Sequence, residues 1–286
     1  MQYNDKNHMK IINLVSYLAL LTVSGLALTG TLGRTAWLNV LLVPHNKFIP
    51  DSKILYLFLL MLFLLGLFTL FQLSVFKHKQ PLIDKIRFTL GWTVPFALIA
   101  YGLGILFRLY QLRVLSMAAY LIGLLVLLIA NGNIRADAEV MNEKLWVRNP
   151  HSVFTGMTLF MLMITIGAVY SSTFRFELSA IILLAVFCAL AAWISTKNKN
   201  IGLLLTFAIA LMTLFKGFRA NDLFSVMVVT GAALLVVYSI VLVRQKPTQE
   251  AGRRLARRAM PKYNGGRPNN LKGVLDPKLY KEADDL

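Results

Sequence analysis

Long stretches without a single charged residue constrain this chain more than any other feature of its sequence. Most are long enough to cross a bilayer, whose hydrocarbon core is about 30 Å thick. Charged residues make up 15% of the 286 residues and apolar residues 57%, whereas a soluble domain has about 25% charged residues. The sequence therefore predicts an all-α, polytopic transmembrane helical bundle of about eight spans. The expected spans are residues 11–33, 54–76, 88–107, 114–134, 151–174, 178–196, 200–215 and 223–243.

Three of these segments raise a structural question. Segment 200–215 reaches only about 24 Å as a helix, so it either spans a locally thinned bilayer or is a re-entrant piece beside seven full spans. Segment 11–33 has no clear small-x-small cleavage site, and we expect a retained helix rather than a signal peptide. Pro95 removes one backbone hydrogen bond within the third span, which predicts a kink between Gly91 and Ile99.

The basic residues are divided unequally between the two sides of the membrane. The formal net charge is +17, and with eight spans 22 of the 30 lysine and arginine residues lie on the side of the two termini. Loop 77–87 alone holds four of them. The positive-inside rule therefore predicts that both termini lie in the cytoplasm.

The sequence carries few of the residues that catalysis or ion coupling requires. No Asp, Glu, Lys or Arg lies inside the predicted spans, which disfavours a proton-coupled transporter. The four histidines (His8, His45, His78 and His151) are dispersed without metal-ligand spacing. Cys188 is the single cysteine, so an internal disulfide is excluded. We therefore expect neither an enzyme nor a metal site.

The connection at residues 34–53 is long and unusually apolar for a loop on the outer side. Such a segment is expected to fold over the bundle as a lid or to lie along the membrane interface. A pocket among the first five helices would then lie beneath it. The candidate ligand-binding residues are Trp37, His45 and Phe48 in the lid and Tyr101, Phe154 and Met157 in the wall.

Residues 244–286 differ in composition from the rest of the chain and predict a basic, largely disordered cytoplasmic tail. Its arginine pairs are four residues apart and would share one helical face. A basic cluster next to a span attracts anionic lipid head groups, and we expect that contact rather than a specific nucleic acid. The cluster consists of Arg253, Arg254, Arg257 and Arg258.

Two segments carry a family resemblance. Residues 50–72 open with a proline and end near a Phe-Gln pair, and residues 145–157 contain Asn-Pro-His before a Gly-Met pair. They resemble the second and fifth helices of the tryptophan-rich sensory proteins, the translocator-protein (peripheral-type benzodiazepine receptor) family, in its longer bacterial form. The long first loop also fits, because in that family it caps the ligand pocket. Where the family has tryptophans or another aromatic, this chain has Leu57, Met157 and His151.

The resemblance implies a five-helix core at residues 1–175 and a three-helix extension at 176–243. It also implies a bacterial inner-membrane protein that binds a hydrophobic or amphipathic molecule or allows it to pass through the membrane. This molecule would be tetrapyrrole-like or sterol-like, and a tetrapyrrole is the only cofactor that the resemblance suggests. The alternative function is a non-enzymatic membrane scaffold or partner subunit that acts through the basic tail. A homo-oligomer is also left open.

Overall fold

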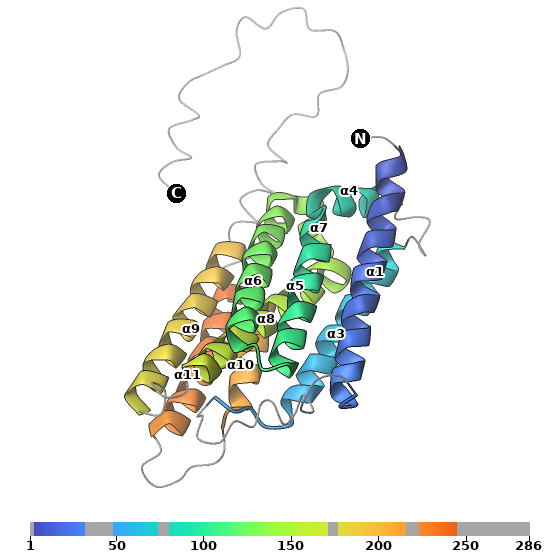
Figure 1. Ribbon diagram of the computed structural model, residues 1–286. Coiled ribbons are helices and arrows are strands. Elements are labelled where there is room, and N and C mark those ends of the chain that lie inside the picture. Colours follow the sequence, from blue (N-terminus) through green and yellow to red (C-terminus); the bar gives the residue numbers. More distant parts are fainter. Residues whose placement is uncertain (1–2, 32–47, 74–79, 171–176, 216–222, 245–286) are drawn as a thin grey trace, which may run out of the picture. The chain divides into compact units, whose positions relative to one another are not determined.

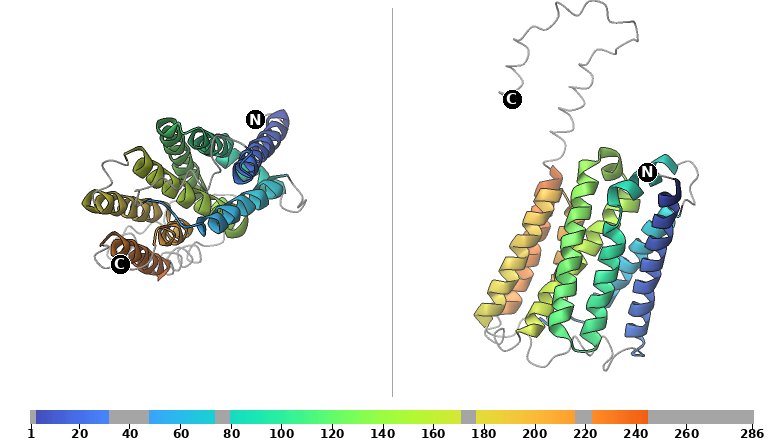
Figure 2. Two further views of the ribbon diagram at one scale, coloured as in Figure 1. Left: turned by 60° about the horizontal axis from the view of Figure 1, so that its bottom comes forward. Right: turned by 45° about the horizontal axis from the view of Figure 1, so that its top comes forward.

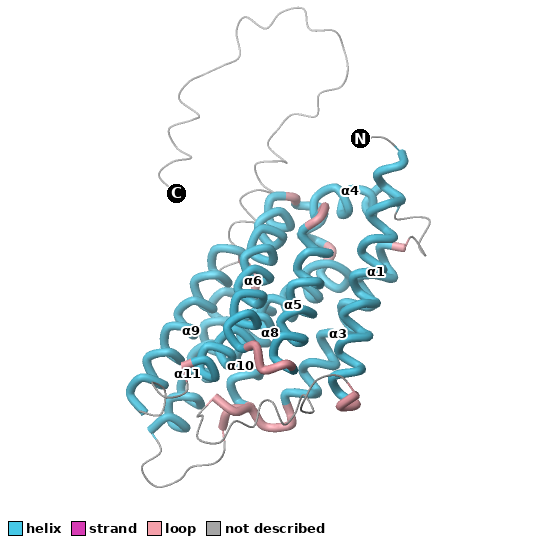
Figure 3. The backbone as a smooth tube through the Cα atoms, in the orientation of Figure 1, coloured by secondary structure: helices cyan, strands magenta, loops and turns pink. Residues whose placement is uncertain are grey.

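The computed structural model describes residues 3–31, 48–73, 80–170, 177–215 and 223–244. Long helices run side by side through this part of the chain (Figure 1). No strand occurs within the described ranges (Figure 3). The prediction of an all-α helical bundle is confirmed.

Each predicted span corresponds to one long or apolar helix, although the ends differ. The first helix begins well before residue 11, and the fifth ends before residue 174. The eight helices are α1 (Tyr3–Leu28), α3 (Ile54–Gln72), α5 (Thr93–Leu109), α6 (Arg113–Ala136), α8 (Asn149–Val169), α9 (Glu177–Asn198), α10 (Ile201–Met212) and α11 (Leu223–Arg244). Shorter elements are α4 (Gln80–Leu90), α7 (Ala138–Asn142) and the π-helical turn η2 (Lys144–Arg148).

Not all eight helices can cross a membrane unaided. Among the described residues, six are long and apolar enough, namely α1, α3, α6, α8 with the preceding η2, α9 and α11. A seventh span results if α4 and α5 are counted as one bent span. Helix α10 has 12 residues and is therefore shorter than a bilayer core requires. The predicted count of eight thus becomes six full spans, one bent candidate and one short helix.

The third predicted span is bent near its start. Helices α4 and α5 meet at 60°, and the break lies at Gly91, whose φ of +48° falls in the left-handed region that glycine adopts without a Cβ penalty. Pro95 lies in the first turn of α5, where a backbone N–H has no helical partner in any case. The predicted bend is therefore present, but Gly91 causes it and Pro95 does not.

Helix α8 is the centre of the bundle. Of its apolar stretch, 83% is buried, a larger share than in the other candidate spans. Residues 154 and 165 lie on the face toward α5 and α6, whereas 156 and 167 lie on the face toward α10 and α11. These faces are opposite because positions two apart on a helix point about 200° apart. The views in Figure 2 show the other helices arranged around this position.

A polar cluster marks the start of the short helix α10. The Oδ1 atom of Asn200 accepts from the Leu203 backbone N–H at 3.2 Å and from Ser152 Oγ at 2.5 Å. Its Nδ2 atom donates to Asn131 Oδ1 at 3.2 Å, and Asn131 Nδ2 donates to Thr155 Oγ1 at 2.8 Å. The cluster connects α6, α8 and α10. Such interhelical hydrogen bonds contribute about 0.6 kcal/mol each in membrane proteins.

Substitution of Gly156 by alanine tests the close approach of α8 to α10. Alanine favours a helix over glycine by about 1 kcal/mol, but its Cβ at this position would lie 2.9 Å from Thr206 Cβ and 3.0 Å from the Leu203 carbonyl oxygen. We expect Gly156→Ala to lower the melting temperature of the purified protein. The control is Gly25→Ala, whose Cβ would meet no atom within 4 Å. Equal melting temperatures for the two variants would contradict the prediction.

Candidate functional site

Four aromatic rings from four helices meet around Tyr101. Its ring lies 5.3 Å from Tyr120 of α6, 5.3 Å from Phe154 of α8 and 6.5 Å from Phe58 of α3, measured between centroids. All four side chains are at most 1% exposed. We call these four residues the aromatic centre. It lies inside the first five spans, where the sequence predicted a pocket.

Gly104 allows Tyr120 to enter the aromatic centre. A Cβ at this position would lie 2.7 Å from Tyr120 Cε1, so no side chain fits there unless the ring moves. Small residues in membrane helices commonly serve this close approach. One turn further along α6, a Cβ at Gly123 would contact Ala100 Cβ at 3.4 Å. The two glycines therefore hold α5 and α6 together around the tyrosine ring.

A buried arginine lies beside the aromatic centre. Arg108 belongs to the last turn of α5 and is only 4% exposed, although the sequence analysis assigned it to a loop. Its Nη1 atom donates to Thr165 Oγ1 of α8 at 2.8 Å. Arg108 follows Tyr101 by two helical turns, so both side chains leave α5 on the same face. The interior of the bundle therefore contains a positive charge that the sequence analysis missed.

The polar groups of this region lack partners. Within the described part of the chain, Arg108 has no ion pair, and its Nε atom has no hydrogen-bond partner. The hydroxyl groups of Tyr101 and Tyr120 are also buried without a partner. Arg113, which starts α6, donates to the Ala168 carbonyl oxygen at 3.1 Å and adds a second positive charge. A buried cation without a counter-ion is costly, and an anionic group bound here would reduce that cost.

The predicted wall residues lie close to one another. Tyr101 and Phe154 are in ring contact, and Met157, one turn along α8, is fully buried. The side chains themselves fill this region. Trp37 and His45 of the predicted lid lie outside the described residues, as do Arg253, Arg254, Arg257 and Arg258 of the tail.

Phe48 lies elsewhere in the bundle. It is 2% exposed and packs against α8 at Gly167, where a Cβ would come within 2.6 Å of its ring. Its ring also meets Phe224 of α11 edge to face at 5.3 Å. Because Gly167 lies on the face of α8 opposite Phe154, the structure does not bring Phe48 to the aromatic centre. The described end of the loop instead covers the junction of α8 and α11.

His151 stands at the position where the family resemblance would place an aromatic residue. It is 1% exposed, and its ring meets Phe68 edge to face at 4.7 Å. Its Nδ1 atom is 2.8 Å from the Val147 carbonyl oxygen. The imidazole therefore packs as an aromatic ring would. Across the described ranges, no group of three or more His, Cys, Asp or Glu residues could hold a metal ion.

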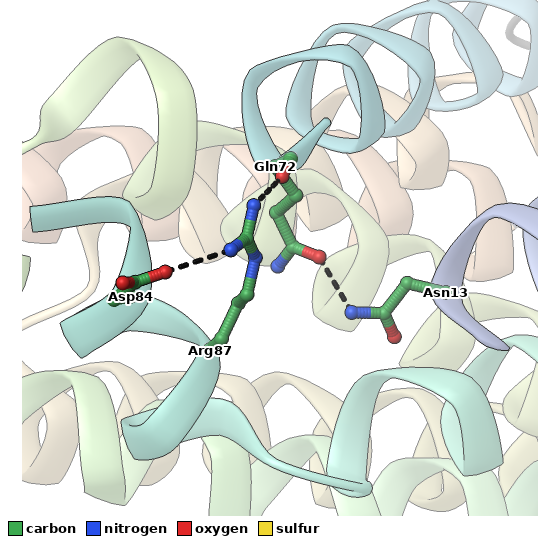
Figure 4. A network of polar contacts seen from close by, with 4 residues as sticks. All are labelled: Asn13, Gln72, Asp84 and Arg87. Carbon is green, nitrogen blue, oxygen red and sulfur yellow. Dashed lines mark hydrogen bonds and ion pairs between the residues drawn. The ribbon is translucent and has the colours of Figure 1, made fainter. Parts of the chain in front are cut away.

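A second buried arginine differs from Arg108 in its surroundings. Arg87 of α4 donates from Nη1 to Asp84 Oδ1 at 2.8 Å and from Nη2 to the Gln72 carbonyl oxygen (Figure 4). The Gln72 side chain accepts from Asn13 Nδ2 at 2.5 Å. These contacts connect α1, α3 and α4. Because the Arg87 guanidinium has a carboxylate partner, we interpret this cluster as a structural connection and not as a ligand site.

The hydrogen bond between Arg108 and Thr165 can be tested with a pair of variants. Thr165→Val removes the acceptor at nearly constant volume and should destabilise the protein by about 2 kcal/mol, as expected for a hydrogen bond to a charged donor. Thr165→Ser retains the hydroxyl group and should restore most of that loss. Thermal unfolding of the purified variants measures both effects. Equal stability of the valine and serine variants would show that the hydroxyl group does not hold the guanidinium.

Comparison with known proteins identifies the family. The sequence model described as TSPO-like protein matches residues 10–242, a range that covers nearly all of the predicted core and of the predicted extension. No curated protein and no solved structure matches the chain. The family match extends from α1 to α11 and agrees with the resemblance seen in residues 50–72 and 145–157. The chain is an integral membrane protein that belongs to the TSPO-like protein family.

Proposed function

We propose that this protein binds a hydrophobic or amphipathic small molecule with an anionic group, or allows such a molecule to pass through the membrane. Arg108 is the observation that carries the proposal. It is buried, has a single hydrogen bond to Thr165 and lacks an ion pair within the described ranges. Arginine matches carboxylate geometry with paired N–H donors. A carboxylate at Arg108 would place an apolar body against the aromatic centre.

The chemistry of the region favours one of the two ligand classes that the family resemblance implies. A sterol-like molecule carries a hydroxyl group and no charge, so it would leave the guanidinium uncompensated. A tetrapyrrole carries carboxylates on a flat, aromatic body, and flat rings pack well against Tyr and Phe side chains. We therefore propose a tetrapyrrole-like molecule in preference to a sterol.

Entry of a ligand requires movement of the aromatic centre. Tyr101, Phe154 and Met157 are at most 1% exposed and already fill the space between their helices. The unpartnered hydroxyl groups of Tyr101 and Tyr120 would gain a partner if these rings turned toward a polar group on the ligand. We propose that the ligand separates the rings rather than occupying a preformed cavity.

The proposal predicts different behaviour for a charged and a neutral tetrapyrrole. Protoporphyrin IX has propionate groups, whereas its dimethyl ester has none that ionise. Arg108→Gln should weaken protoporphyrin IX binding by about 30-fold or more, because one partner of a buried charge pair is lost. Binding of the ester should change little. Saturable quenching of tryptophan fluorescence in the full-length purified protein measures both affinities.

Arg113→Gln is the matched control for this experiment, because Arg113 is a neighbouring arginine that bonds to a backbone carbonyl. Because Arg113 is only partly buried, its loss should weaken protoporphyrin IX binding less than Arg108→Gln does. The melting temperature of each variant shows whether the fold is retained. Equal losses of acid and ester binding in Arg108→Gln would remove the basis for an anionic ligand.

The closed packing of the aromatic centre also favours a second candidate function, a non-enzymatic scaffold or partner subunit that acts through the basic tail. Tyr101 and Tyr120 are fully buried, and Phe58 and Phe154 are 1% exposed. This function predicts that deletion of residues 249–286 abolishes the cellular phenotype of the protein, whereas Arg108→Gln leaves it unchanged. Complementation of a deletion strain measures both. The opposite pattern would exclude the scaffold.

We also propose that the protein lies in a bacterial inner membrane with both termini in the cytoplasm. The unequal distribution of Lys and Arg over the connecting loops supports this orientation. The N-terminal end of α1 and the C-terminal ends of α6 and α9 lie at the same end of the bundle (Figure 1), as that topology requires.

A further inference from the structure

A groove between α6 and α9 is not used by the proposed function. Its volume is about 490 Å³, which is within the range of small-molecule sites. Leu128, Gly132 and Ile194 form part of its apolar floor. A Cβ at Gly132 would meet no atom within 4 Å, so this glycine leaves open space in place of a packing contact. The two helices are adjacent (Figure 1) but touch at few positions, which leaves the groove open between them.

The groove faces the lipid. Apolar side chains next to it on both helices are highly exposed, including Leu125 at 53%, Ile129 at 58% and Val186 at 55%. In a spanning helix, such side chains contact acyl chains. The floor of the groove is therefore continuous with the lipid-facing surface of the bundle. An occupant could enter it sideways from the bilayer.

The rim of the groove is basic and aromatic. Arg135 of α6 and Lys197 of α9 line its end, together with Trp193. Lys197 Nζ lies 4.8 Å from the centroid of the Trp193 ring, and Trp193 is 56% exposed. Tryptophan and basic residues at a helix end are typical of the head-group region of a bilayer. The rim therefore lies at the depth of lipid phosphates.

The positive charge of the rim is held in place, and no ion pair of the described side chains neutralises it. Arg135 Nη1 donates to the Lys197 carbonyl oxygen, which fixes the guanidinium at the end of α9 while its other N–H groups remain available. Arg148 donates in the same way to the Lys199 carbonyl oxygen but does not line the groove. Among the residues whose side chains the structure describes, no acidic residue lines the groove, and the neighbouring Asp137 pairs with Lys85 at 3.1 Å.

We propose that this groove binds one anionic phospholipid of the surrounding bilayer. The lipid phosphate lies between Arg135 and Lys197, and an acyl chain lies along the floor past Gly132. The combination of an apolar floor and a basic rim at one depth matches the two parts of such a lipid. Basic pockets between membrane helices bind anionic head groups in this way. The site is separate from Arg108 and does not depend on the proposed ligand.

Brominated lipids can test the site, because bromine on an acyl chain quenches a tryptophan that it touches. The full-length protein is reconstituted into vesicles that contain either brominated phosphatidylglycerol or brominated phosphatidylcholine. The Trp193 signal is the fluorescence of the protein, or of a given variant, minus the fluorescence of the same protein with the additional substitution Trp193→Phe. We expect phosphatidylglycerol to quench this signal with about 25-fold higher apparent affinity, about fivefold for each of the two basic side chains. Equal quenching by the two lipids would overturn the proposal.

A double variant, Arg135→Gln with Lys197→Gln, should abolish the preference for phosphatidylglycerol, with about a fivefold loss for each basic side chain removed. The matched control, Lys10→Gln with Arg244→Gln, removes two charges that do not line the groove and should keep the preference. Loss of the preference in the control would show a diffuse surface effect and would contradict a specific site.

Deletion of residues 245–286 separates the groove from the basic tail. If the groove itself binds the lipid, the truncated protein should keep the preference, and Arg135→Gln with Lys197→Gln should still abolish it. Loss of the preference on truncation alone would assign lipid binding to the tail and overturn the proposal.

Discussion

The close packing of α8 is the constraint on which the rest of this bundle depends. Apolar helix surfaces gain little by leaving lipid, since acyl chains are as apolar as leucine, and association depends on close contact and interhelical hydrogen bonds. Helix α8 offers both. Its glycines at 156 and 167 admit α10 and Phe48, while Phe154 and Thr165 on the other face hold α5. The short helix α10 persists between longer neighbours because it is packed against α8 and capped by Asn200.

Much of the fold could be predicted because the length of each charge-free segment reflects the thickness of the bilayer core. The predictions that were wrong concern positions where a span ends or bends. Arg108 was assigned to a loop since a charge usually ends a span, but α5 continues through it and buries it. Its spacing of two turns from Tyr101 was a signal for one shared face. The bend was attributed to Pro95, whereas the positive φ of Gly91 causes it, and a sequence does not show which of two such residues takes the strained conformation.

The candidate site was harder to predict, because its residues come from separate helices. Tyr101 and Phe154, two of the predicted wall residues, are in ring contact, yet Phe48 was grouped with them on the argument that an apolar loop covers a pocket. Two residues can be in contact only when they lie on the same helix face as well as at the same end of the bundle. Phe48 packs at Gly167, which lies on the face of α8 opposite Phe154. Two arginines with the same 4% exposure show the same limitation. Arg87 has Asp84 three residues before it on the same helix, a spacing that the sequence itself shows. Arg108 has no carboxylate in the described ranges, and only the packing of the helices shows that it is buried.

An apolar ligand in a membrane poses a selectivity problem that the position of Arg108 addresses. Lipid surrounds the bundle in great excess, and an aromatic or aliphatic wall distinguishes poorly between a ligand and an acyl chain, because both are apolar. A polar group left unpaired discriminates far more strongly than a change of apolar shape. Arg108 is buried beside the aromatic centre, whereas Arg135 and Lys197 lie at the exposed rim of a lipid-facing groove. In the two proposed roles, the same kind of charge selects an anionic ligand inside the bundle and an anionic lipid outside it, according to the surface that surrounds it.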